Sequence, residues 1–77
     1  MSLRGYSYKL VEAIRAANPE LIGVQLGLAC INVNIPVSDV AKAFKVSRIT
    51  VYSWFIGASK PHPQKVKLIK HFLAKKK

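Results

Sequence analysis

The sequence predicts an all-α domain, a small bundle of five helices. Apolar residues recur at intervals of three and four in the segments between the prolines, as they do along one face of an α-helix. None of these segments alternates strictly between apolar and polar residues, which is the pattern of a half-buried strand. The chain has 77 residues, of which 51% are hydrophobic, enough for one packed core and therefore for a single domain over residues 1–77.

The first helix is expected over residues 7–17, as an addition on the N-terminal side of the bundle. Its polar residues, among them Lys9, Glu12 and Arg15, gather on one side. The other side is apolar and should point inward; it carries Leu3, Tyr6, Leu10, Ala13, Ile14 and Ala17.

A second helix is expected from Pro19 to Asn32. Asn18 is a good N-cap residue, and proline suits the first helical position because no N–H is needed there. The segment is apolar nearly all round, so it should lie at the centre of the bundle. Gly23 and Gly27 are four residues apart and would let another helix cross this one closely.

Two short helices are expected next, over Val37–Phe44 and from the N-cap residue Ser47 to about Ile56. Lys45 lies in the turn between them, and Gly57 suits the left-handed residue that ends the second helix. The last helix opens at a proline and is followed by a basic tail over residues 74–77. From Pro63 on, its inward residues should be Val66, Ile69, Phe72 and Leu73, and its solvent-facing ones Lys65, Lys67 and Lys70.

The charge balance points to an anionic partner. Thirteen lysine and arginine residues stand against three acidic ones, a formal net charge of +10. Such an excess destabilises a compact chain by self-repulsion, so it usually signals nucleic acid. An acidic membrane is disfavoured, because the most apolar helix has no cationic face and is too short to span a bilayer.

Cys30, the only cysteine, has apolar neighbours. This predicts a buried thiol in a reducing compartment, and the cytoplasm is the expected location. A secretory leader is not expected, because the segment Tyr6–Asn18 is amphipathic where a leader would be uniformly apolar.

The segment from Val37 to Ile56 has the spacing of a helix-turn-helix. Two short helices cross tightly, leaving the outer face of the second exposed, only if small and medium apolar residues fill the crossing. Ala41 is small enough for close approach, and Val46, five residues later, fills the turn. Val51 and Trp54 follow ten and thirteen residues after Ala41 and would anchor the second helix from beneath.

These twenty residues resemble the helix-turn-helix of the Cro/repressor-like family of phage and bacterial transcription regulators. Gly57, Lys60 and Pro61 resemble the family's continuation, so the resemblance extends over residues 21–73. It implies a lambda-repressor-like fold and a phage-encoded, sequence-specific transcriptional regulator or repressor. Its expected partner is double-stranded DNA, in the cytoplasm or nucleoid of a bacterial host cell.

Two features depart from the family's pattern. Lys45 stands where the turn usually has glycine, and a left-handed backbone there would cost up to about 1 kcal/mol. One clear helix follows the motif where many of these repressors have two. A homodimer is the expected state, with its interface on the Leu21–Ile31 helix or on the last helix.

By this resemblance, the helix that begins at Ser47 lies in the major groove with its N-terminal end toward base edges. Arg48 would bond guanine O6 and N7 together, worth about 1–3 kcal/mol of discrimination, and Ile49 would pack on a thymine methyl. The candidate base contacts are Ser47, Arg48, Ile49, Tyr52 and Ser53. The candidate phosphate contacts, expected to flank the same surface, are Ser38, Lys42, Lys45 and Lys60.

Other interpretations stay open. The motif is compatible with a helical hairpin used only for packing, Arg48 with a solvated charge, and Ile49 and Tyr52 with core residues. One alternative function is a protein-interaction module that targets a host protein such as RNA polymerase. Another is non-specific coating of nucleic acid, in which the cations contact phosphates only.

Catalysis has little support. The three acidic residues form no convincing pair, and no glycine-rich phosphate loop is present. Cys30, His62 and His71 lack the spacing of a metal site. We therefore expect a protein that is not an enzyme and that needs no cofactor or metal.

Overall fold

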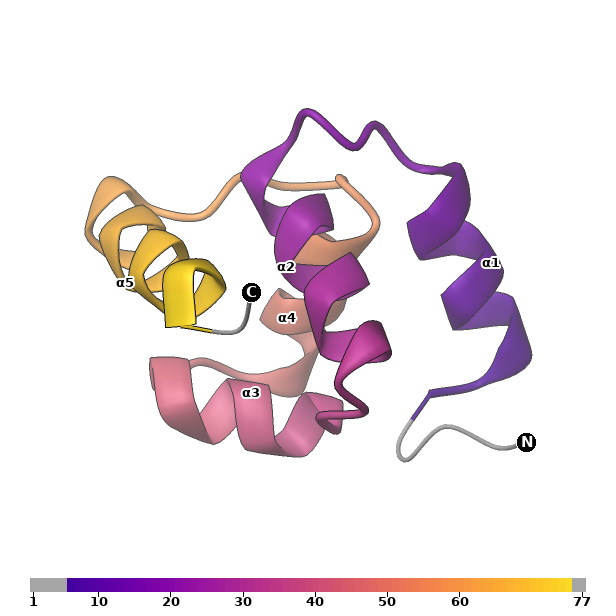
Figure 1. Ribbon diagram of the computed structural model, residues 1–77, viewed down its shortest axis with the longest axis horizontal. Coiled ribbons are helices and arrows are strands. Elements are labelled where there is room, and N and C mark those ends of the chain that lie inside the picture. Colours follow the sequence, from indigo (N-terminus) through magenta and orange to yellow (C-terminus); the bar gives the residue numbers. More distant parts are fainter. Residues whose placement is uncertain (1–5, 76–77) are drawn as a thin grey trace.

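Five α-helices follow one another in the computed structural model, which describes residues 6–75 (Figure 1). Between these limits the chain forms no β-strand, so the all-α prediction is confirmed. Lys76 and Lys77 of the expected basic tail lie outside the described residues, and the first half of that tail belongs to the last helix. The helices are α1 Tyr8–Ala16, α2 Ile22–Asn32, α3 Val37–Phe44, α4 Arg48–Phe55 and α5 Pro63–Lys75.

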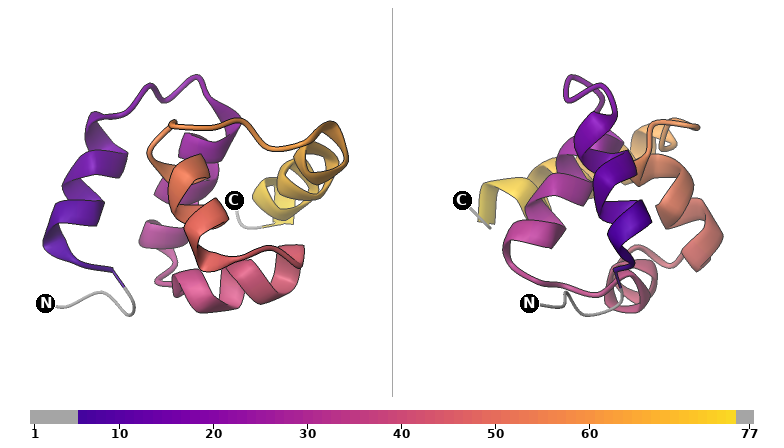
Figure 2. Two further views of the ribbon diagram at one scale, coloured as in Figure 1. Left: turned by 180° about the vertical axis from the view of Figure 1, so that it is seen from behind. Right: turned by 90° about the vertical axis from the view of Figure 1, so that its right-hand side faces the viewer.

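Helix α2 lies at the centre of the bundle, as its apolar sequence predicts. It packs against α1, α4 and α5, and its side chains Val24, Leu26 and Cys30 are fully buried (Figure 1). Seen from behind, α4 stands in front of α2, with α1 and α5 on its two sides and α3 below (Figure 2). Because three helices pack against α2, most of its apolar side chains are buried within the chain.

Two glycines of α2 let α4 approach closely, as their spacing predicts. A Cβ atom on Gly23 would lie 2.5 Å from the backbone oxygen of Trp54. A Cβ atom on Gly27 would lie 2.9 Å from Cγ of Phe55 and 3.2 Å from Cγ2 of Ile14. The backbones of α2 and α4 therefore meet at a distance that a side chain at Gly23 would not permit.

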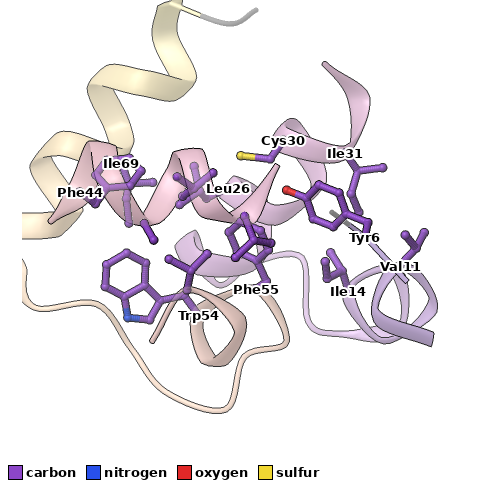
Figure 3. Close-up of a cluster of buried hydrophobic side chains, with 14 residues drawn as sticks. Tyr6, Val11, Ile14, Leu26, Cys30, Ile31, Phe44, Trp54, Phe55 and Ile69 are labelled. Carbon is purple, nitrogen blue, oxygen red and sulfur yellow. The ribbon is translucent and has the colours of Figure 1, made fainter. Parts of the chain in front are cut away.

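One hydrophobic cluster joins side chains from all five helices (Figure 3). Trp54 and Phe55 of α4 enter it from one side, beside Leu26 of α2. The ring of Phe44 meets that of Trp54 edge-on, with 6.3 Å between centroids. Such aromatic pairs add to the burial of apolar surface and fix the mutual orientation of α3 and α4.

The inward face of α1 follows the prediction at Leu10 and Ile14 and differs from it at Ala13. Ala13 is exposed, whereas Val11, placed on neither predicted face, is buried together with Ile14. Ile14 sets this orientation because it packs into the gap left by Gly27. Alanine has little apolar surface to bury, so leaving it exposed costs less free energy than exposing the larger valine.

Helix α2 begins three residues later than predicted, at Ile22. The side chain of Asn18 does not cap it. Its Oδ1 atom accepts a hydrogen bond from the N–H of Glu20 at 2.9 Å, and its carbonyl oxygen accepts one from the N–H of Leu21 at 3.1 Å. Asn18 thus closes a turn before the helix, and this hydrogen bond competes with the capping of α2 by the same side chain.

Tyr6 ties the start of the described chain to the loop between α2 and α3. Its hydroxyl donates a hydrogen bond to the carbonyl oxygen of Ile35 at 2.6 Å, and its ring stacks on Phe55 at a centroid distance of 6.4 Å. Burial raises the pKa of Tyr6 well above its ordinary value, with a smaller contribution from the neighbouring Cys30.

Replacing Gly23 by alanine should lower the free energy of unfolding by about 1–3 kcal/mol, because the added methyl meets the Trp54 backbone, which cannot rotate away. Urea unfolding measures this loss. Asn32→Ala, at an exposed position of the same helix, is the control and should unfold near the wild-type midpoint. A Gly23→Ala protein as stable as wild type would contradict the close crossing.

Tyr6→Phe should lower the free energy of unfolding at neutral pH by about 1 kcal/mol, since it removes one hydrogen bond. Folding raises the pKa of Tyr6, so the hydroxyl's contribution is complete below about pH 10, the ordinary tyrosine value, and is lost as the pH rises beyond it. Urea unfolding of both proteins should therefore show their difference shrinking above about pH 10. A constant difference would contradict the burial of this hydroxyl.

Candidate nucleic-acid interface

Helices α3 and α4 are joined by a short turn at Lys45 and Val46. Lys45 has a φ of 57°, in the left-handed region, at the position where the resembled family has glycine. Its N–H donates to the carbonyl oxygen of Lys42 at 3.3 Å, and that of Val46 donates to Ala41 at 3.0 Å. These hydrogen bonds end α3 and offset part of the cost of a side chain in that conformation.

Ser47 caps α4, as the sequence predicts. Its Oγ accepts a hydrogen bond from the N–H of Thr50 at 3.2 Å and shares another with Oγ1 of Thr50 at 2.9 Å. This hydroxyl, a candidate base contact, is thus already engaged within α4. At the other end of the helix Gly57 has a φ of 79°, the left-handed conformation expected there.

The two faces of α4 differ in burial. Val51, Trp54 and Phe55 are buried on the inner face, as predicted. Ile49 is 77% exposed, so it is not a core residue. The residues predicted beside it, Tyr52 and Ser53, are only half-exposed, and Tyr52 packs against the core cluster.

A groove lies between α3 and the start of α4. It brings together two of the predicted base contacts and two of the predicted phosphate contacts, which come from different helices. Its two cationic and two hydroxyl side chains can bind an anion or hydrogen-bonding groups. The lining residues are Ser38, Ala41, Lys42, Val46, Ser47 and Arg48.

Two further candidates lie outside this groove. Lys45 is exposed in the turn next to it. Lys60 lies in the loop between α4 and α5, where it lines a separate hollow with Glu20 and Leu21. Lys60 and Lys42 therefore line different hollows, at the two ends of α4 in the chain (Figure 1).

Lys65 does not point freely to solvent as predicted. Its Nζ donates a hydrogen bond to the carbonyl oxygen of Phe44 at 2.8 Å, and its side chain is half-buried. A cation here faces the negative end of the α3 dipole, which stabilises the contact. This hydrogen bond also holds α5 against the α3–α4 pair, at the residue before Lys45.

The net charge is unevenly distributed along the chain. Residues 1–39 hold three cations and three acids, whereas residues 40–77 hold ten cations and no acid. The whole formal charge of +10 thus belongs to the part that forms α3's second half, α4 and α5. Comparing the two halves of the sequence would have shown this asymmetry.

The chain matches no protein-family model, no curated protein and no solved structure. Among residues 6–75, no three histidine, cysteine, aspartate or glutamate side chains are grouped so as to hold a metal ion. The helices of this part of the chain are all too short or too polar to cross a membrane. The candidate interface therefore rests on the geometry and charge of the α3–α4 pair.

Ser47→Ala should lower the free energy of unfolding by about 1 kcal/mol, because it leaves the N–H of Thr50 without its side-chain partner. Urea unfolding measures the change, and Ser47→Gly should lose less. Ser59→Ala, an exposed serine of the α4–α5 loop, serves as the control. Equal stability of the Ser47→Ala and Ser59→Ala proteins would contradict the capping role.

Proposed function

We propose that this protein binds duplex DNA sequence-specifically, with α4 in the major groove, and acts as a transcriptional regulator. The observation that carries the proposal is the groove between α3 and α4, where Arg48 and Lys42 meet at the start of a helix whose outer face is exposed. Both of these cations belong to the half of the chain that carries the whole net charge. A polyanion would relieve the self-repulsion of this half.

The dimensions of α4 suit this role. An α-helix with its side chains is about 10–12 Å across, and the major groove is about 12 Å wide, so the exposed side of α4 could enter it. Arg48 would bond the O6 and N7 atoms of guanine. Ser38, Lys42 and Lys45 would contact phosphates and fix the orientation of α4 on the duplex.

A homodimer would double the contacts made by so short a helix. With most apolar side chains of α2 buried, we favour α5 as the interface, and its Leu68 is 47% exposed. The cytoplasm is the proposed location, in keeping with the buried thiol of Cys30.

Binding to a random duplex pool tests the proposal. Repeated selection should yield sites bound about a thousandfold more tightly than random DNA at the same salt concentration. A steep salt dependence without such a gap would replace the proposal by non-specific coating. Weak binding to every duplex would replace it by a protein-interaction module.

Arg48→Ala should reduce the ratio between the affinities for selected and for random duplexes by about 5- to 150-fold, because it removes one bidentate base contact. The slope of log K against log salt should fall by at most about one. Arg15→Ala, which removes the same charge from the exposed side of α1, is the matched control and should leave the gap unchanged. Equal gaps for both variants, measured by fluorescence anisotropy, would contradict base contact by Arg48.

A further inference from the structure

The outer face of α4 carries an apolar stripe. Ile49 is 77% exposed and Ile56 is 40% exposed, and Ser53 lies between them. Ile49 and Ser53 are four residues apart on one side of α4, and Ile56, the residue that caps the end of the helix, follows on that side. The side chains along this stripe are uncharged, and Arg48 is the only charged residue of α4.

This composition limits what α4 can read in a major groove. Arginine, lysine, asparagine, glutamine and acidic side chains read particular bases by hydrogen bonding, whereas a serine or threonine hydroxyl can bond to either kind of base edge and discriminates little. Besides Arg48, α4 has none of the discriminating side chains. The remaining feature of base edges that an aliphatic side chain can contact is the C5-methyl group of thymine.

We infer that α4 selects its sites through thymine methyl groups, and that Ile49 makes the principal methyl contact; this inference rests on the proposed binding to duplex DNA. Arg48 and Ile49 are adjacent at the start of the helix, so a guanine contact and a methyl contact would fall on neighbouring base pairs. Ile56, at the far end of the stripe, would add a contact near the edge of the site.

The surroundings of the stripe favour DNA over a protein partner. Ile49 directly follows the cationic groove formed by Lys42 and Arg48, and Lys45 is exposed beside it. Two isoleucines separated by a serine form a small apolar area, whereas a stable protein interface buries about 800 Å² on each partner. A few methyl contacts within a field of cations match the major groove of a polyanion.

Replacement of thymine by deoxyuridine tests the inference, because it removes the methyl group and leaves the hydrogen-bonding edge unchanged. Each thymine of a duplex selected from the random pool is replaced in turn, and the affinity is measured by fluorescence anisotropy. At one or more positions we expect the wild-type protein to bind about three- to fivefold more weakly, the effect of one methyl group.

Ile49→Ala should abolish this deoxyuridine penalty, because the two changes remove partners of the same contact. Val33→Ala, which shortens an exposed apolar side chain just after α2, is the matched control and should retain it. Since Ile49 is exposed, its variant should unfold at the wild-type urea midpoint, which separates a lost contact from a lost fold.

Two results would overturn the inference. The methyl contact would be ruled out if selected duplexes were bound equally well with deoxyuridine at every thymine, while Arg48→Ala still lowered their affinity relative to random DNA. The proposed DNA-binding function would then stand. If selected and random duplexes were bound with equal affinity, both the methyl contact and the proposed sequence-specific binding would be ruled out. Uniformly weak binding would then indicate a protein partner for the stripe.

Discussion

The close crossing of α2 and α4 is the constraint on which the rest of the structure depends. Gly23 allows the Trp54 backbone to lie where any other residue would place a side chain. Once α4 is held there, Val51, Trp54 and Phe55 must face inward and Arg48 and Ile49 outward. The exposed face of α4 is thus a consequence of how its other face is packed.

The two halves of the chain contribute differently to the bundle. The electrically neutral half forms α1 and α2 and supplies the central helix, which is wrapped by its neighbours. The cationic half forms the rest of the bundle and supplies the two cations of the groove, Lys42 and Arg48. Its charges repel one another in the free protein, and this repulsion would fall when phosphates neutralise them.

Local signals predicted most of the fold. Ser47 and Gly57 bound α4 as expected, because caps and left-handed ends depend on neighbouring residues alone. Ala13 of α1 was wrongly placed on the inward face because Gly27, on another helix, decides which side of α1 fits. Lys65 was likewise assigned to solvent, since its partner carbonyl at Phe44 is brought near only by the tertiary fold.

The same distinction applies to the candidate site. Residues on α3 and α4 were brought together as their spacing within one short motif suggested. Lys60 was not, because the direction of the loop after Gly57 depends on how α5 packs against α2. The half-burial of Tyr52 has a similar origin, because the core cluster that it packs against is built from all five helices.

Lys45 combines a strained left-handed backbone with a positive charge next to the groove. Glycine would adopt this backbone without strain, yet it would delete a positive charge at the mouth of the groove. Lysine keeps the charge and tolerates the strain. Glycine would suit this backbone best, and under the proposed binding to DNA the charge that lysine adds beside the groove would compensate for the strain.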